Sequence, residues 1–228
     1  MGVVCFPLAS RRIGFSDSSR RRKFLKFLHT QKNMKAIIFD ADGMLLLGER
    51  FSSRYSREFG VPMETLSKFF SEKFPACILG TADLRDELRP FLPEWKWNGE
   101  IDELLNYWFR GNYLNQDMLS MAASLRAGGV RCFLATNQEK YRMAYLRHRL
   151  GISNILEDCF VSSEIGFKKP QREFFQHISE RLSFIPNDQI FFWDDRPENV
   201  TAAREFGFQA ELYTDPISFK ETVQPFSK

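Results

Sequence analysis

The sequence predicts an α/β protein in which a helical cap is inserted after the first strand of a Rossmann-like parallel sheet. From residue 35 onward, short apolar runs alternate with longer amphipathic segments. Such short runs, rich in β-branched and aromatic residues, favour strands, and the amphipathic segments favour helices. A single long stretch of helical pattern, residues 49–116, interrupts this alternation. Strands that alternate with helices form parallel sheets covered on both faces, so we expect the interruption to be an insertion.

Five apolar runs are the expected strands of the sheet, and four amphipathic segments are the expected helices between them. The strands are expected at 35–39, 129–135, 159–162, 189–193 and 210–213. The helices are expected at about 117–127, 138–149, 171–182 and 198–206. A glycine follows three of these helices, and each is expected to form a left-handed cap: Gly128, Gly151 and Gly207.

The insertion divides the chain into three expected regions. Residues 34–48 and 117–228 form the α/β core, and residues 49–116 form a helical cap in which no buried strand is expected. Residues 1–33 form a basic leader that we expect to be disordered. An organelle transit peptide, or a translated upstream region with Met34 as the true start, is the alternative for this leader. An export signal is excluded because no apolar stretch follows the arginines.

The net charge of +3 comes from the leader. Residues 1–33 hold eight of the 32 Lys and Arg and one of the 29 Asp and Glu, which leaves 24 basic and 28 acidic residues in the rest. A mildly acidic body with its basic charge on a tail is not typical of a nucleic-acid binder. We therefore expect no nucleic-acid partner.

Cysteine usage and hydropathy indicate a cytoplasmic protein. The four cysteines are scattered and form no C-x-x-C pair, which argues against a zinc site and a disulfide framework. Reduced thiols are the simplest interpretation. No apolar run approaches the roughly 20 residues that cross a membrane. We expect no membrane partner and a monomer or weak dimer.

Polar clusters follow the apolar runs where ligands bind in a parallel α/β sheet, outside the carboxyl ends of the strands. Three runs end at such a cluster, and a fourth cluster follows the third run after a short loop. The clusters are Asp40-x-Asp42, Thr136-Asn137, Lys168-Lys169-Pro170 and Asp194-Asp195.

These residue types have one chemical use in common. Carboxylates without His or Cys favour Mg²⁺ over Zn²⁺, and Mg²⁺ is often shared with a substrate phosphate. A lysine adds a positive charge beside the phosphoryl group, and a threonine hydroxyl with the following N–H can bind phosphate oxygens. Positioning and charge neutralisation are the main requirements of phosphoryl transfer, and a carboxylate can act as the nucleophile.

Each cluster also has a structural interpretation. Asp40-x-Asp42-Gly43, Lys168-Lys169-Pro170 and Asp194-Asp195 could be turns, and Thr136-Asn137 could be a helix N-cap. An acidic pair directly after Ile-Phe-Phe-Trp is, however, unfavourable at a buried edge without a cation. The ordered set favours a functional site over four unrelated turns.

Taken in this order, the four clusters resemble those of the haloacid dehalogenase superfamily of hydrolases, over residues 35–215. The closest likeness is to capped phosphatases, including small sugar-phosphate phosphatases. The segment Phe192-Trp193-Asp194-Asp195-Arg196-Pro197-Glu198-Asn199-Val200 is typical of that branch. The acid at Asp42 favours P–O over C–halogen cleavage, because the dehalogenase branch lacks it.

The resemblance implies a role for each site residue. Asp40 is the nucleophile and a metal ligand. Asp42 is the acid and then the base, and its backbone carbonyl contacts the metal. Thr136, the backbone of Asn137, and Lys169 in preference to Lys168 bind the phosphoryl group. Asp195 is the direct metal ligand, with Asp194 acting directly or through water.

The implied function is a Mg²⁺-dependent phosphohydrolase acting through an aspartyl phosphate on a small phosphorylated metabolite, with a sugar phosphate as the expected substrate. The alternatives are a phosphomutase of the same fold and a non-catalytic binding module that retains it. The cap contributes Tyr107, Trp108, Arg110 and Tyr113 as candidates to face the substrate, and Arg110 is the one expected to bind it, although aromatic residues at helical spacing are more often core.

Overall fold

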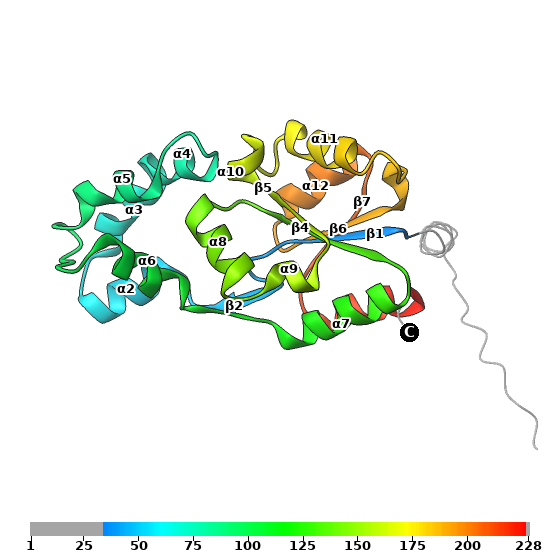
Figure 1. Cartoon of the computed structure of the whole chain (residues 1–228), viewed down its shortest axis with the longest axis horizontal. Helices are drawn as coiled ribbons and strands as arrows, with labels where there is room; N and C mark the ends of the chain where they lie inside the picture. Colours follow the sequence, from blue (N-terminus) through cyan, green and yellow to red (C-terminus); the bar gives the residue numbers. More distant parts are fainter. Residues whose placement is uncertain (1–33, 227–228) are drawn as a thin grey trace, which may run out of the picture. The chain divides into compact units, whose positions relative to one another are not determined.

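The computed structural model describes residues 34–226, so the expected leader at 1–33 lies outside the described residues. The core is a five-stranded sheet in the order β5-β4-β1-β6-β7, and every pair of neighbours is parallel (Figure 1). The five predicted strands are confirmed, each within two residues of its expected limits. They are β1 (Ala36–Phe39), β4 (Arg131–Thr136), β5 (Asp158–Val161), β6 (Ile190–Asp194) and β7 (Gln209–Leu212).

The central strand β1 is buried on both faces because its side chains alternate between two apolar layers. Ile37 and Phe39 enter one layer, and Ala36 and Ile38 enter the other. All four are inaccessible to solvent. This explains why the strand is a continuous apolar run, as expected for a parallel sheet covered by helices.

Helices cover the two faces of the sheet, and in Figure 1 α11 and α12 lie on one side and α7 on the other. The first layer packs against α7 (Gln116–Ala127), α8 (Lys140–His148), α9 (Ile152–Ile155) and α13 (Pro216–Val223). The second layer packs against α11 (Arg172–Arg181) and α12 (Pro197–Phe206). The remaining core elements are short: α10 (Ser162–Ile165), η2 (Asn187–Gln189) and η3 (Gln224–Phe226).

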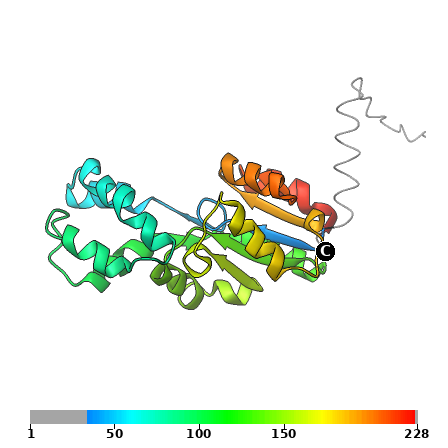
Figure 2. The same ribbon diagram turned by 90° about the horizontal axis from the view of Figure 1, so that it is seen from above.

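The insertion after the first strand contains helices with an apolar core of their own. Its helices lie together, apart from those that cover the sheet (Figures 1 and 2). They are α2 (Phe51–Phe59), α3 (Met63–Glu72), α4 (Phe74–Ile78), α5 (Leu84–Leu88), η1 (Arg89–Phe91) and α6 (Ile101–Phe109). Trp95 and Tyr55 lie at the centre of this core, both with no exposed surface, and the Tyr55 hydroxyl donates to the Trp95 carbonyl at 2.8 Å.

A two-stranded antiparallel ribbon joins the insertion to the core. It pairs β2 (Leu46–Gly48) with β3 (Asn112–Leu114). β3 was not predicted from the sequence, because a strand of three residues with partly exposed side chains contains no apolar run. The range 49–116 stays a prediction for the limits of the cap.

One of the three predicted glycine caps is wrong. Gly128 keeps a right-handed conformation with φ −76°, and the next residue, Gly129, has φ +90°. Gly207 caps α12 with φ +114°, as predicted, and Gly151 has φ +72° three residues beyond the end of α8, directly before α9. A Gly-Gly pair offers two positions for the left-handed residue, and the sequence does not say which is used.

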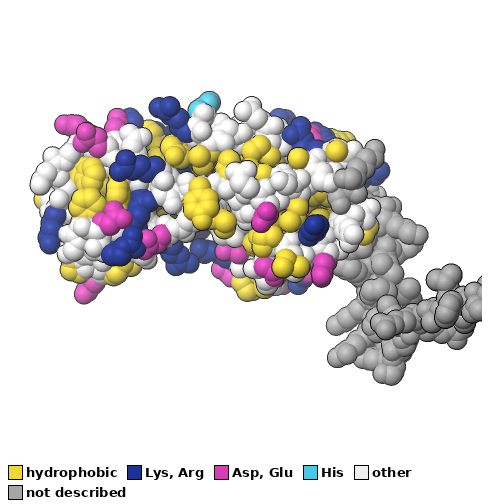
Figure 3. Space-filling view, turned by 90° about the horizontal axis from the view of Figure 1, so that it is seen from below, with side chains coloured by type: hydrophobic (Ala, Val, Ile, Leu, Met, Phe, Trp, Pro, Cys, Tyr) yellow, Lys and Arg dark blue, Asp and Glu magenta, His cyan; other side chains and the backbone are white. Residues whose placement is uncertain are grey.

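Helix hydropathy and surface charge can also be described for these residues. No helix of residues 34–226 is long and apolar enough to cross a membrane. On the face drawn in Figure 3, acidic and basic side chains are interspersed rather than separated.

The buried side chain of Phe175 attaches α11 to the sheet, so Phe175→Ala should destabilise the fold. The ring contacts Phe192 of β6 at 5.5 Å and Phe208 at 6.1 Å between centroids. Removing a fully buried ring should lower the free energy of unfolding by about 3–5 kcal/mol. Equilibrium urea unfolding measures this loss. Phe167→Ala, at a ring that is 41% exposed, is the matched control, with an expected change of at most about 0.5 kcal/mol. Equal losses in the two variants would contradict this account of the core.

Candidate active site

The parallel register of three neighbouring strands brings three polar side chains to one edge of the sheet. Asp40 directly follows β1, Thr136 ends β4 and Asp194 ends β6. The Asp40 N–H donates to the Trp193 carbonyl at 2.9 Å, which continues the ladder between β1 and β6 by one residue. Asp40, Thr136 and Asp194 are buried, with exposed fractions of 7%, 1% and 0%. The fold thus holds two carboxyl groups side by side with little access to water.

The Lys169 ammonium lies between these two carboxyl groups. It donates to Asp40 Oδ1 at 2.6 Å, to Asp194 Oδ2 at 2.7 Å and to the Ala135 carbonyl at 2.7 Å. An ammonium has three donors, so all of them are used. Lys169 is 3% exposed. Burial lowers its pKa, but the two carboxylates outweigh burial and raise the pKa above the ordinary value, so the side chain is charged.

One ammonium does not neutralise the acids around it. Burial, with a contribution from Asp194, raises the pKa of Asp40 to about 7 even though Lys169 lowers it. Burial also raises the pKa of Asp195, again with a contribution from Asp194. Three carboxyl groups around one ammonium leave the cluster short of positive charge.

A metal cation would supply that charge, and the geometry fits one. Oxygen atoms of Asp40, Asp194 and Asp195 lie within 4.8 Å of one another. All three are hard ligands, as Mg²⁺ prefers. The turn after β1 approaches Asp195 closely at Gly43, where a Cβ atom would lie 2.4 Å from Asp195 Oδ2 and φ is +83°. Glycine is therefore required at this position for the turn to pass the acidic cluster.

The two neighbouring acids at the end of β6 differ in their surroundings. Asp194 accepts four contacts, from Lys169, from the Arg196 N–H at 2.9 Å, and from Asn199 Nδ2 at 2.9 and 3.0 Å. These contacts occupy the four lone-pair positions of a carboxylate. Asp195 is exposed on the cavity side. Asp195 is thus the more accessible of the two as a direct ligand.

Asp42 contacts two residues, Gln138 and Arg142, that were not predicted from the sequence. Its carboxylate accepts from Arg142 Nη1 at 2.8 Å and Nη2 at 2.6 Å, and from Gln138 Nε2. Burial raises the pKa of Asp42, but Arg142 and Gln138 outweigh burial and hold it below the usual range. Gln138 lies in the loop before α8, and Arg142 lies in the first turn of that helix. No local pattern marks the pair, because their common feature is the contact with Asp42.

Asn137 fixes the backbone that carries the lysine. Its Nδ2 donates to the Lys169 carbonyl, and its Oδ1 accepts from the Lys169 N–H, both at 2.9 Å. The side chain of Thr136 lines the cavity, as does that of Lys168, whose own N–H donates to Gln171. The N-cap interpretation of Thr136-Asn137 is wrong: Glu139 caps α8 and accepts from the N–H groups of Tyr141 and Arg142.

A cavity of about 760 Å³ extends from these side chains to the inserted helices. Asp40, Asp42, Lys169 and Asp195 lie on its wall. Arg110 is not among the lining residues; it is exposed, and its guanidinium lies 5.7 Å from the Tyr107 ring. The structure therefore places Arg110 away from the cluster that it was expected to serve.

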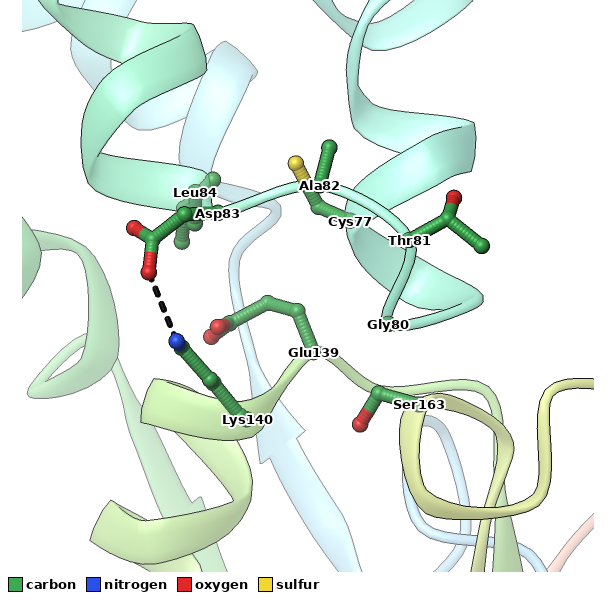
Figure 4. Close-up of a pocket in the computed structure, with 9 residues that line it drawn as sticks. All are labelled: Cys77, Gly80, Thr81, Ala82, Asp83, Leu84, Glu139, Lys140 and Ser163. Carbon is green, nitrogen blue, oxygen red and sulfur yellow. Dashed lines mark ion pairs between the residues drawn. The ribbon is translucent and has the colours of Figure 1, made fainter.

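A second contact region holds the inserted helices against the core, around a cavity of about 220 Å³ (Figure 4). The Lys140 ammonium lies 2.6 Å from Asp83, and the Tyr141 hydroxyl donates to the same carboxylate at 2.8 Å. Ser162 Oγ donates to the Ile78 carbonyl at 2.7 Å. Gly80 packs so closely that a Cβ atom would lie 2.2 Å from the Ser163 carbonyl oxygen. These contacts place the inserted helices over the acidic cluster.

Comparison with known proteins gives a family and two partial relatives. A sequence model of haloacid dehalogenase-like hydrolases matches residues 34–207. A sesquiterpene phosphatase from Aspergillus oryzae is 29% identical over 101 residues, which cover 44% of this chain and 51% of the relative. A drimenol cyclase from Aspergillus calidoustus is 28% identical over 86 residues, covering 38% and 16%. The chain thus spans about half the length, or less, of the curated relatives it matches.

Solved structures share the fold. A haloacid dehalogenase family enzyme from Bacteroides thetaiotaomicron superposes with a TM-score of 0.69 at 17% identity, over 80% of this chain and 94% of that one. The same enzyme in complex with magnesium and inorganic phosphate gives a TM-score of 0.67, also at 17% identity, over 79% and 94%. A predicted hydrolase of this type from Porphyromonas gingivalis gives 0.66 at 19% identity, over 79% and 91%.

The raised pKa of Asp40 makes a prediction about stability in the absence of divalent cations. Asp40 titrates near 7 in the folded protein and near its ordinary value of 3.8 when unfolded. The unfolded state therefore releases this proton first, and folding stability falls as the pH rises from about 4 to about 7. Asp40→Asn does not titrate, so its free energy of unfolding should rise relative to wild type across this interval, by up to about 4 kcal/mol.

Urea unfolding at a series of pH values in EDTA measures the difference. Asp117→Asn, which removes an acid from the first turn of α7, is the control and should show no such trend. A constant difference between Asp40→Asn and wild type from pH 4 to pH 7 would contradict the assignment.

Proposed function

The chain belongs to the haloacid dehalogenase-like hydrolases, and from this premise we propose that it is a magnesium-dependent phosphohydrolase that cleaves a small phosphate monoester. The observation that carries the proposal is the carboxylate cluster around Lys169 with a second acid, Asp42, two residues beyond Asp40. The likeness to a sesquiterpene phosphatase, and to a structure that binds magnesium and inorganic phosphate, supports P–O cleavage.

Asp40 is the proposed nucleophile. One of its oxygens attacks phosphorus, the bond from phosphorus to the leaving oxygen breaks, and an aspartyl phosphate forms. Lys169 holds Asp40 Oδ1 at 2.6 Å, which leaves Oδ2 for the attack. The same ammonium lies beside the developing negative charge of the phosphoryl group and stabilises it.

Asp42 is the proposed acid and base. In its protonated form it gives a proton to the leaving alcohol oxygen, and this form requires that the bound phosphate raise the pKa that Arg142 lowers in the free protein. As a carboxylate it then takes a proton from water, whose oxygen attacks phosphorus and releases Asp40 and inorganic phosphate. Its contact with Arg142 at 2.6 Å favours the ionised form, which is the form required for the second step.

The phosphate and metal ligands follow from their positions. Thr136 and the backbone N–H of Asn137 are the proposed phosphate donors, and Lys169, whose three donors are already used, contributes its positive charge. Asp40, Asp195 and the backbone carbonyl of Asp42 would hold Mg²⁺, with Asp194 acting through its charge because its lone pairs are occupied. When bound, the ion would neutralise the phosphoryl oxygens and align them with Asp40.

The two alternatives receive less support. A phosphomutase must bind a second phosphate in its cap, and among the described lining residues of 49–116 the one cationic side chain is Arg50. A non-catalytic binding module would not need Asp40, Asp42 and Lys169 together. A sugar phosphate remains compatible with the catalytic end, because the residues there recognise the phosphate and not the alcohol.

Removing the nucleophile should abolish turnover. With Mg²⁺, the wild-type protein should hydrolyse p-nitrophenyl phosphate, and EDTA should stop the reaction. Asp40→Asn should lower kcat by more than about 10³-fold, since an amide is not a nucleophile at phosphorus. Asp117→Asn should keep wild-type activity. Release of p-nitrophenol is the measurement, and activity of Asp40→Asn near that of wild type would refute the mechanism.

Blocking the second step should trap the intermediate. Asp42→Asn cannot deprotonate water, so the aspartyl phosphate should persist and turnover should fall by about 10²–10⁴-fold. Mass spectrometry of the acid-quenched protein should show a phosphate added at Asp40. The double variant Asp40→Asn with Asp42→Asn is the control and should show none. A phosphate on any other residue would exclude Asp40 as the nucleophile.

A further inference from the structure

The cavity has two ends of different chemistry. The core end carries the carboxylates, Lys169 and Thr136. The opposite wall comes from helices α2–α6, whose described lining residues are six apolar side chains and two serines. The apolar set is Phe51, Met63, Phe70, Phe74, Ile78 and Trp108. We call this set the apolar wall.

Three of the polar side chains near this wall already have hydrogen-bond partners, while Arg50 and Ser52 line the cavity beside Phe51. Ser67 Oγ donates to the Glu64 carbonyl at 2.8 Å. Asn112 Oδ1 accepts from Arg142 at 3.0 Å, and Gln138 Nε2 donates to Asp42. A sugar phosphate would bring several hydroxyl groups against this surface. Burying hydroxyls without partners is unfavourable, so the wall is a poor match for a polyol.

The apolar wall is also preformed. Phe51 stacks on Trp108, with centroids 4.4 Å apart and planes at 21°. Phe70 meets the Trp108 ring edge-on at 5.4 Å, and Phe74 contacts it at 5.5 Å. Because these rings already hold one another in place, a ligand would not need to order them on binding.

Met63 is the accessible part of the apolar wall. It is 46% exposed and lies on the cavity wall at the start of α3. Methionine is flexible and polarisable and adapts to apolar ligands of varied shape. An apolar group in the cavity would cover it.

We propose that the substrate is the phosphate monoester of an apolar alcohol, with its hydrocarbon part against the apolar wall and its phosphate at Lys169. This inference rests on the proposed phosphohydrolase function and replaces the sugar phosphate expected from the sequence. Binding is then divided: the core recognises the phosphate, and the inserted helices select the alcohol by removing its surface from water.

A series of n-alkyl phosphates tests the inference. Ethyl, butyl, hexyl and octyl phosphate, kept below micelle-forming concentrations, are compared with glucose 6-phosphate by release of inorganic phosphate. Each added methylene should raise kcat/KM by up to about fourfold until the wall is covered. Octyl phosphate should exceed glucose 6-phosphate by at least tenfold. 2-Naphthyl phosphate is assayed in the same way, and its kcat/KM relative to octyl phosphate shows whether an aryl or an alkyl leaving group is preferred.

Two variants locate the effect at the wall. Met63→Gln should flatten the dependence of kcat/KM on chain length from ethyl to octyl phosphate, because it replaces an apolar side chain of the wall with a polar one. Ser67→Leu should extend the wall and raise kcat/KM for octyl phosphate. Ile217→Gln, at a side chain that is 72% exposed and outside the cavity, is the matched control for Met63→Gln and should behave as wild type.

The outcomes separate the two proposals. No chain-length dependence, or a preference for glucose 6-phosphate, overturns the apolar substrate and leaves the phosphohydrolase proposal standing. Failure to hydrolyse any ester, p-nitrophenyl phosphate included, overturns both. If Met63→Gln and Ile217→Gln change the dependence of kcat/KM on chain length equally, the apolar wall is not the cause of that dependence.

Discussion

The Lys169 ammonium, buried between the Asp40 and Asp194 carboxylates, is the interaction on which the rest of the site depends. Its three donors are used by two acids and one carbonyl, so its position is fixed to within hydrogen-bond geometry. Two buried carboxylates would repel each other without it, and with Asp195 added the cluster still lacks positive charge. The ion pairs of Lys169 stabilise the fold, and a metal cation can neutralise the negative charge that the one ammonium does not.

Several parts of the fold serve this one contact. The register of β1 with β4 and β6 sets the spacing of the acids. The Asn137 side chain donates to the Lys169 carbonyl and accepts from the Lys169 N–H, and the Asn199 side chain donates to Asp194. These residues act through position. A buried ion pair is favourable only when its geometry is good and its remaining donors and acceptors are satisfied, and the amide side chains provide that.

The inserted helices add a surface that the core cannot supply. Their aromatic core around Trp95 and Trp108 makes them a rigid unit, and the ribbon of β2 and β3 joins that unit to the turn after Asp42. The contacts of Asp83 and Ile78 with the core then orient the inserted helices so that the apolar wall faces the acids. In the proposed function, phosphate chemistry belongs to the α/β core and recognition of the alcohol to the inserted helices, and both line one cavity.

The sequence by itself determined the sheet, the insertion and the positions of the acids along the chain, because these depend on local patterns: apolar runs, helical periodicity and polar residues at strand ends. It could not identify Gln138 or Arg142, whose importance lies in a contact with Asp42 about 100 positions away. It also placed the left-handed glycine at Gly128 instead of Gly129 and expected Arg110 at the substrate. Only the tertiary structure decided which side chains of the insertion line the cavity, since an aromatic residue buried in a core and one facing a ligand have the same helical spacing. Packing of the inserted helices on the core sets that choice, and no local pattern encodes it.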